Sequence, residues 1–220
     1  MEFKPHGYQQ HCIDKIIGIK KIGLFLDMGL GKTIVTLMAI KELKFYRFQV
    51  RKVLIIAPKK VAEGTWSKEK NKWEHTKGLK ISKVLGSANQ RIKALYEKAD
   101  IYIINRDNVT WLVDFYKNNW DFDMVVIDES SSFKSPMAKR FKSLASVTHR
   151  IDRLIELTGT PSPNGLKDLW AQIYLLDQGQ RLEKKYKQFR EKYFQPGKRG
   201  RDGTVYNYDL KNGSEAAILS

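Results

Sequence analysis

The sequence predicts an α/β domain with a mostly parallel sheet and helices on both of its faces. Short apolar runs typical of buried strands alternate with amphipathic helical patterns throughout residues 22–176. Polar residues follow several of these runs directly, where the carboxyl ends of parallel strands would meet at one edge of the sheet. A chain of 220 residues can bury a sizeable core, and its single cysteine, Cys12, excludes an internal disulfide.

The first elements surround a glycine-containing loop. Apolar spacing predicts a short helix within residues 1–20, and the amide of Gln9 in this helix can pair with an adenine edge. A surface glutamine on a capping helix is the alternative. Residues 24–33, which read LFLDMGLGKT, predict a strand, a loop and the start of a helix that continues to Leu43.

The loop has the composition of a phosphate-binding loop. Its residues are Gly29, Leu30, Gly31, Lys32 and Thr33. Glycines let backbone N–H groups turn toward phosphate oxygens, and the helix N-terminus adds partial positive charge. Lys32 would reach the β- and γ-phosphates, and the Thr33 hydroxyl would bind Mg²⁺. The strict pattern has a glycine where this chain has Leu26, so a plain strand–turn–helix is the alternative.

Three more strands are predicted at residues 53–57, 81–85 and 101–104. The first ends at Pro58, Lys59 and Lys60 before a helix that runs to Trp73, and the third ends at Asn105 and Arg106. In open α/β sheets, ligands gather at the edge where these residues would lie.

The helix after the second of these strands has a marked start. Ser87 and Gln90 have the spacing of a capping box. We assign the buried face of this helix to Ile92, Leu95 and Tyr96.

Residues 124–127 predict a strand that runs straight into two carboxylates, Asp128 and Glu129. The first can hold the hydrated Mg²⁺ of a nucleotide, and the second can orient and deprotonate an attacking water. The alternative is a helix N-cap, since acidic residues suit first turns. An upstream phosphate-binding loop favours the catalytic interpretation.

A last strand, residues 154–157, leads into Thr158, Gly159 and Thr160, and the two threonine hydroxyls could bridge the acidic pair to bound substrate. An ordinary strand-to-turn transition is the alternative. Apolar residues from Leu166 to Tyr174 then recur with the spacing of an amphipathic helix.

The chain carries a net charge of +16, which favours a polyanionic partner such as nucleic acid over an acidic membrane surface. We expect a boundary near Gln178, with residues 1–178 as one lobe and 179–220 as a basic helical and loop extension. Lys184, Lys185 and Lys187 belong to this extension and could contact phosphates, although a solvated helix face is an equal alternative. Residues 198–201 predict a basic loop, and Tyr206 and Tyr208 a short edge strand.

No apolar run approaches the length of a membrane span, and residues 1–5 lack a signal-peptide core. We therefore expect a cytoplasmic protein with no membrane partner, in the host cytoplasm if a phage encodes it.

Taken in order, these motifs resemble the first RecA-like lobe of superfamily 2 helicases. Among these, the chain is most similar to Swi/Snf-type DNA-dependent ATPases, especially those of bacteriophages. The resemblance covers about residues 5–212 and implies a RecA-like three-layer fold. The motifs that carry it are Tyr8-Gln9, Met28–Thr33, Ala57-Pro58-Lys59, Asp128–Ser131, Leu157–Pro161 and Leu169-Trp170.

The resemblance implies roles for these residues toward ATP, Mg²⁺ and DNA. Gln9 would read adenine, and Lys32 and Thr33 would hold the triphosphate and Mg²⁺. Asp128 would bind the metal, and Glu129 would activate water. Residues that would touch the backbone of DNA, most simply duplex DNA, are Pro58, Lys59, Lys60, Asn105 and Arg106. Residues that would couple hydrolysis to movement are Thr158, Gly159 and Thr160.

Two departures from the family matter. The acidic motif ends in Ser130-Ser131 and not in Ala-His or Ala-Asp, which questions coupling through its last position. The chain also stops before the second RecA-like lobe that such enzymes use to hydrolyse ATP. Three functions therefore remain: a DNA-dependent ATPase lobe of a translocase, a nucleotide-gated DNA-binding module without turnover of its own, and an unrelated enzyme such as a small-molecule kinase.

Overall fold

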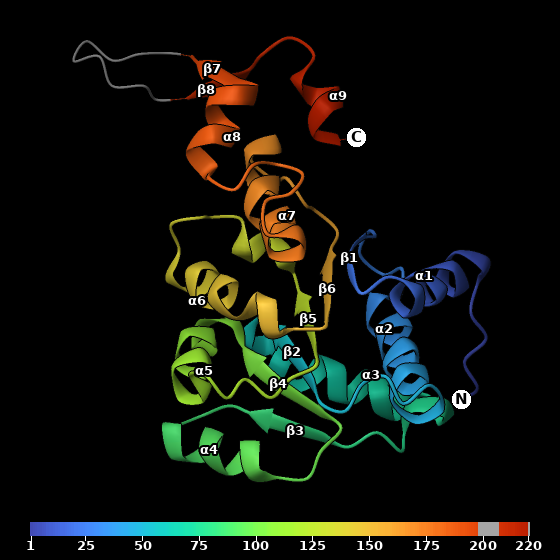
Figure 1. Ribbon diagram of the computed structural model, residues 1–220. Coiled ribbons are helices and arrows are strands. Elements are labelled where there is room, and N and C mark those ends of the chain that lie inside the picture. The colour runs from blue at the N-terminus through green and yellow to red at the C-terminus, as the bar shows by residue number, and fades with distance from the viewer. Residues whose placement is uncertain (198–206, 220) are drawn as a thin grey trace.

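Six parallel strands form the central sheet of the computed structural model, which describes residues 1–197 and 207–219 (Figure 1). The strand order is β1-β6-β5-β2-β4-β3, and every neighbouring pair is parallel. The strands are β1 (Lys21–Phe25), β2 (Val53–Ala57), β3 (Ile81–Val84), β4 (Ile101–Asn105), β5 (Met124–Asp128) and β6 (Arg153–Thr158). The predicted parallel α/β architecture is confirmed.

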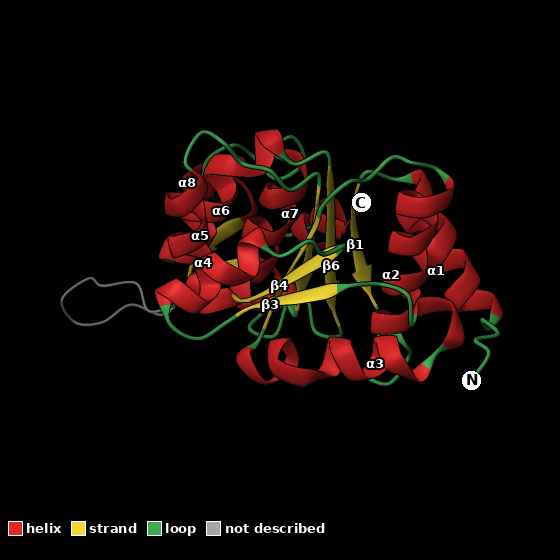
Figure 2. Ribbon diagram, turned by 90° about the horizontal axis from the view of Figure 1, so that it is seen from below, coloured by secondary structure: helices red, strands yellow, loops and turns green. Residues whose placement is uncertain are grey.

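Helices cover both faces of this sheet (Figure 2). One face carries α1 (Gly7–Gly18), α2 (Lys32–Lys41) and α3 (Trp66–Lys72). The other carries α4 (Ala88–Tyr96), α5 (Val109–Tyr116), α6 (Lys139–Val147) and α7 (Leu169–Asp177). Short π-helical segments, Glu42–Tyr46 and Val61–Thr65, extend α2 and precede α3.

The apolar strand runs follow from burial on both faces. Leu54 and Ile56 of β2 pack among the residues of α4–α7, whereas Val53 and Ile55 pack among those of α1–α3. A strand covered on both faces has no solvent side, so its sequence is continuously apolar instead of alternating.

The helix α4 confirms one prediction and corrects another. The Ser87 backbone N–H donates to Oε1 of Gln90 at 2.8 Å, and the Gln90 N–H donates to Oγ of Ser87, so the capping box forms. Tyr96, which we assigned to the buried face, is 80% exposed. The helix covers the edge strand β3 and buries Ala94 and Leu95, which leaves the side of the helix that carries Tyr96 at the margin of the sheet.

Residues after α7 continue the core. Gln178 ends α7 with a left-handed backbone, and α8 (Tyr186–Tyr193) follows. Phe189 of α8 is fully buried in the core that contains Trp170, and Nε1 of Trp170 donates to the Glu183 carbonyl at 3.0 Å. The remaining elements are β7 (Phe194–Pro196), antiparallel to β8 (Tyr208–Leu210), and α9 (Ser214–Leu219).

Tyr208 begins a strand, as predicted. Tyr206 and the predicted basic loop of residues 198–201 lie outside the described residues.

Candidate active site

The carboxyl edge of the sheet collects most of the predicted site residues. The strand order places the segments after β1, β6 and β5 side by side, and the segments after β2 and β4 next to them. The first group contains the glycine loop, residues 158–160 and the acidic pair. The second group contains residues 58–60 and 105–106. One edge thus has two adjoining halves, one with the glycine loop and the acidic pair and the other with basic groups.

The glycine loop is shaped by two left-handed residues. Gly29 has φ +82° and Gly31 has φ +80°, and α2 begins at the next residue, Lys32. The left-handed backbone of Gly31 favours glycine, and a Cβ there would lie 2.7 Å from Nε2 at the end of the Gln9 side chain, which would have to move. Leu26, where the strict pattern has glycine, is not among the residues with positive φ, so its side chain imposes no strain.

Lys32 folds back over the loop. Its Nζ donates to the carbonyl oxygens of Leu26 at 2.7 Å and Asp27 at 3.1 Å. The cation therefore lies against the loop at the N-terminus of α2, where the first backbone N–H groups of the helix have no partners within it. An anion at this helix end would meet both kinds of donor, and the half-buried Thr33 follows in the first turn.

Gln9 connects the first helix to this loop. Its side chain is buried, with Oε1 accepting from the His6 backbone N–H at 3.0 Å and Nε2 donating to the Leu30 carbonyl at 3.4 Å. Gln9 is therefore not a surface residue. Its side chain does, however, take part in the capping box at the start of α1. A cavity of about 380 Å³ opens beside Gln9, and its lining includes Phe3, His6, Gly29, Gly31 and Trp73.

Asp128 is a nearly buried carboxylate at the end of β5. It is 9% exposed, and its Oδ2 accepts a hydrogen bond of 2.8 Å from Nε1 of the fully buried Trp66. Burial raises the pKa of Asp128 to about 6, with a smaller contribution from neighbouring Glu129. The Trp66 hydrogen bond and the Lys32 charge oppose this rise.

Glu129 has a strained backbone. Its φ of 58° and ψ of 60° are left-handed, a conformation that costs about 1–2 kcal/mol for a residue with a Cβ. Its side chain makes no capping hydrogen bond to the short 3₁₀ turn that follows, so helix capping does not account for it. Strain of this kind is concentrated at functional positions.

The segment after β6 lies against the base of the glycine loop. The Leu26 N–H donates to the Thr158 carbonyl at 3.1 Å, and a Cβ at Gly159 would lie 3.3 Å from the Leu26 carbonyl oxygen. Oγ1 of the buried Thr158 accepts from the Thr160 N–H at 3.1 Å. This threonine hydroxyl therefore shapes its own turn.

The basic residues form two separate groups. Ala57 pairs with Asn105 in register, so the segments after β2 and β4 adjoin, with Lys59 and Lys60 exposed and Pro58 and Arg106 half-buried. Asn105 uses Oδ1 to accept from the Asp107 N–H of its own turn.

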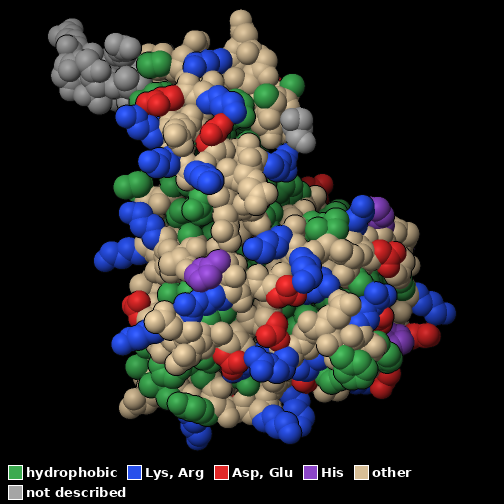
Figure 3. Space-filling view, in the orientation of Figure 1, with side chains coloured by type: hydrophobic (Ala, Val, Ile, Leu, Met, Phe, Trp, Pro, Cys, Tyr) green, Lys and Arg blue, Asp and Glu red, His purple; other side chains and the backbone are tan. Residues whose placement is uncertain are grey.

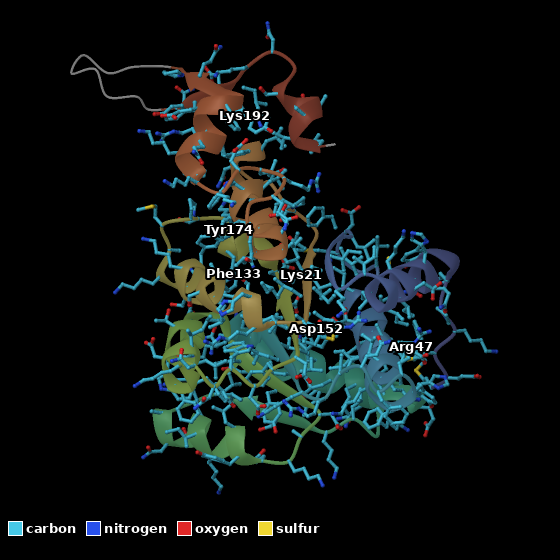
Figure 4. All side chains as sticks on the ribbon, viewed as in Figure 1. Lys21, Arg47, Phe133, Asp152, Tyr174 and Lys192 are labelled. Atoms are coloured by element: carbon cyan, nitrogen blue, oxygen red, sulfur yellow. The ribbon has the colours of Figure 1, made fainter. Side chains whose placement is uncertain are left out.

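The extension lysines belong to another part of the molecule. Lys184, Lys185 and Lys187 are exposed on or before α8, which packs against α7 and β7. Lys187 lies 3.8 Å from Glu191. Lys192, also on α8, is labelled near the top of Figure 4, well above Phe133 and Asp152. The extension lysines on and before α8 and the basic residues after β2 and β4 are therefore two separate groups.

Positive charge is spread widely over the molecule. Lys and Arg side chains are scattered across the face shown in Figure 3, with fewer acidic side chains between them. Among the described residues, no group of three or more His, Cys, Asp or Glu side chains could hold a metal ion, and no helix is long and apolar enough to cross a membrane.

Several residues of the site were missed from the sequence. Trp66 lies 62 residues before its partner Asp128, and no sequence pattern reports such a contact. The buried Glu156 on β6 and Gln172 on α7 were also missed. For Glu156 a signal existed, since it is the one acid within an otherwise apolar strand run, residues 154–157.

Comparisons with known proteins agree with this geometry. The SNF2-related domain family matches residues 8–211. Putative protein p41 of the Acyrthosiphon pisum secondary endosymbiont phage 1 is 39% identical over 198 residues, which cover 87% of this chain and 43% of the phage protein. The ISWI chromatin-remodeling complex ATPase ISW1 of Saccharomyces cerevisiae is 28% identical over 179 residues, 77% of this chain and 15% of ISW1.

A solved structure shares the fold. The Sulfolobus solfataricus SWI2/SNF2 ATPase core in complex with dsDNA superimposes with a TM-score of 0.74 at 26% identity, covering 88% of this chain and 39% of that one. The chain thus spans less than half the length of these relatives. With a six-stranded parallel sheet and a family match over most of its length, the chain belongs to the SNF2-related domain family.

Proposed function

We propose that this chain is the ATP-binding first lobe of a helicase-like DNA translocase, which hydrolyses ATP when it is paired with a second lobe and DNA. The observation that carries the proposal is the assembly of the glycine loop, Asp128 and Glu129 at one sheet edge. Membership of the SNF2-related family argues against the small-molecule kinase. The ATPase names of the relatives support the reaction class.

The residues present fit a nucleotide and its Mg²⁺. The left-handed Gly31 leaves space that any Cβ would fill, and Lys32 supplies a cation at the helix N-terminus. Asp128 and Thr33 are the oxygen ligands offered by the chain, so the remaining ligands would be phosphate and water, as Mg²⁺ prefers. When bound, Mg²⁺ would neutralise charge on the phosphates.

Each side chain then has a defined task. When nucleotide binds, Lys32 gives up its hydrogen bonds to the loop carbonyls and donates to phosphate oxygens instead. The amide of Gln9 lies beside the 380 Å³ cavity, where it would form hydrogen bonds with an adenine. Glu129 accepts the proton of the attacking water. Thr158 and Gly159 contact the base of the loop, the Thr160 N–H bonds to Thr158, and the three residues so transmit a change at the nucleotide to the rest of the lobe.

We propose that the phosphate backbone of DNA is contacted by residues at the ends of β2 and β4, which lie at the same sheet edge as the proposed nucleotide site. These residues are Pro58, Lys59, Lys60, Asn105 and Arg106. The dsDNA in the solved SWI2/SNF2 structure supports a duplex partner. Residues 179–220 then lead toward the second lobe, and Lys184, Lys185 and Lys187 add phosphate contacts of their own. A phage-encoded relative supports action in a host cytoplasm.

A nucleotide-gated DNA-binding module is the second candidate, because the chain spans less than half of its relatives. It shares every binding residue and differs only in turnover.

The nucleotide site is tested by measuring ATP affinity calorimetrically for Lys32→Ala beside Lys93→Ala, a matched control at an exposed lysine of α4. Loss of a charge-assisted bond to phosphate weakens binding by about 1.5–3 kcal/mol, roughly 10–150-fold. The control keeps wild-type affinity. Equal affinity in folded Lys32→Ala protein would contradict the assignment of the glycine loop.

A further inference from the structure

A buried polar cluster lies behind the acidic pair, on the face of the sheet covered by α7. Glu156 of β6 is fully buried and pairs in register with Ile127, one residue before Asp128. Neither of its carboxyl oxygens has a hydrogen-bond partner of standard geometry among the described residues. A carboxyl group in such a position is rare in a folded protein and calls for a physical reason.

The neighbours of Glu156 have directed hydrogen bonds. The hydroxyl of Ser130, also fully buried, donates to Oε1 of Gln172 at 2.8 Å. Nε2 of Gln172 donates to the carbonyls of Pro161 at 2.6 Å and Asp168 at 3.0 Å. Both amide hydrogens of Gln172 and the one hydroxyl hydrogen of Ser130 are therefore in use, and the free capacity of Ser130 is as an acceptor.

The carboxyl group of Glu156 suits this free position only when it is protonated. A neutral carboxylic acid can donate to the Ser130 oxygen, whereas a carboxylate can only accept. Burial raises the pKa of Glu156 well above its ordinary value, and the adjacent Ser130 hydroxyl opposes the rise only in part. Geometry and environment thus favour the same form.

We propose that Glu156, Ser130 and Gln172 are positioning residues that tie the acidic end of β5 to the segment after β6. Hydrogen bonds run from Ser130 through the Gln172 amide to the carbonyl of Pro161, the last residue of the Thr158–Pro161 segment, and Glu156 lies next to Ser130. Ser130 directly follows the strained Glu129, so a fixed Ser130 holds that backbone in place.

The acidic motif of this chain ends in Ser131, and not in the histidine or aspartate of the family. The hydrogen bonds of Ser130 and Gln172 would connect the motif to the segment after β6 in place of that residue. Its effect on turnover rests on the proposed function, but the tie itself does not.

Kinetics of the full-length protein with ATP and duplex DNA test the effect on turnover. Ser130→Ala and Glu156→Leu lower kcat by about 10–100-fold, the range found when groups that orient ligands are lost. ATP affinity stays within about twofold, because none of these side chains reaches the nucleotide site. Glu156→Gln rescues kcat, since its amide donates as the neutral acid does. Thermal melting confirms folding, and Ser130→Ala, which removes one atom, keeps the test valid if Glu156→Leu does not fold.

A second measurement is independent of turnover. The ¹³C carboxyl signal of Glu156, assigned by its absence in Glu156→Gln, reports a protonated acid at pH 7, and Ser130→Ala increases amide exchange in residues 158–162. An ionised Glu156 and unchanged exchange, or full kcat in Ser130→Ala, would overturn the tie. Absence of DNA-stimulated turnover in the wild type, with the carboxyl and exchange results as expected, would instead overturn the proposed function alone.

Discussion

At the scale of single residues, the two carboxylates at the end of β5 have different surroundings. Asp128 is buried and bonded to Trp66, whereas Glu129 is half-buried on a strained backbone. Two acids with such different environments are suited to different tasks. Asp128 is held by Trp66, which suits its proposed role as a metal ligand. The Glu129 side chain has no hydrogen bond within residues 1–197 and 207–219, which suits its proposed role as the base.

Glu129→Gln should retain ATP binding and lose turnover in the full-length protein. The amide keeps the shape of the side chain but cannot accept a proton, and loss of a general base costs about 10²–10⁴-fold in rate. Steady-state hydrolysis and nucleotide affinity are measured on the same preparation. Turnover near the wild-type level would mean that Glu129 is not the base.

Asp128 should make stability depend on pH when nucleotide and Mg²⁺ are absent. Its pKa of about 6 in the folded protein exceeds the ordinary aspartate value of 3.8, which applies to the unfolded chain. Between these values the folded state binds more protons, so the free energy of unfolding falls as pH rises, by about 3 kcal/mol in total. Below about pH 3 the acid is neutral in both states and the penalty disappears.

Asp128→Asn removes this titration while an oxygen remains to accept from Trp66. Urea unfolding at pH 7.5 should therefore find the variant more stable than the wild type, with the difference vanishing at about pH 3. A variant that is equally destabilised at both pH values would show that the ionised form of Asp128 is not penalised. The same variant should weaken the Mg²⁺ dependence of ATP binding.

At the scale of elements, the strands could be predicted because burial on both faces leaves a continuous apolar signature, as in β2. The polar residues after each strand could be placed together because parallel strands end at one edge. The side of a helix at the margin of the sheet could not be predicted, which is why Tyr96 is exposed. Contacts such as Trp66–Asp128 arise from the docking of α3 against β5, which leaves no periodic signal in the sequence.

The lysines of the extension offer a test at this scale. Replacing Lys184, Lys185 and Lys187 by Gln should flatten the dependence of log K on log salt for duplex DNA by up to about 0.9 per lost phosphate contact. Lys187 is expected to contribute least, because Glu191 lies 3.8 Å away. Fluorescence anisotropy at several salt concentrations measures the slope.

The matched comparison is a variant in which Lys59 and Lys60, at the sheet edge beside the proposed nucleotide site, are replaced by Gln. A slope unchanged in the extension variant but reduced in the Lys59/Lys60 variant would assign the extension to solvent and the DNA to the sheet edge alone.

At the scale of the whole molecule, the part of the chain that the structure describes carries one set of the proposed nucleotide-binding elements, and the chain spans less than half the length of its relatives. In phosphoryl transfer an arginine from a second body stabilises the developing charge and is worth about 10³–10⁵ in rate. In the family, this arginine belongs to the second lobe. Arg181 is exposed after α7, where its backbone N–H donates to Asp177, and we expect it to be a surface or DNA-facing residue and not this arginine.

The measurement that tests the central claim most directly is steady-state ATP hydrolysis with and without saturating duplex DNA. It compares residues 1–220 with a version extended through any second lobe, and Lys32→Ala of the extended version sets the background. We predict that residues 1–220 bind ATP but turn it over very slowly, and that DNA stimulates the extended version. Equal, DNA-stimulated rates in both would contradict the account, because this lobe would then supply its own arginine or borrow one by self-association.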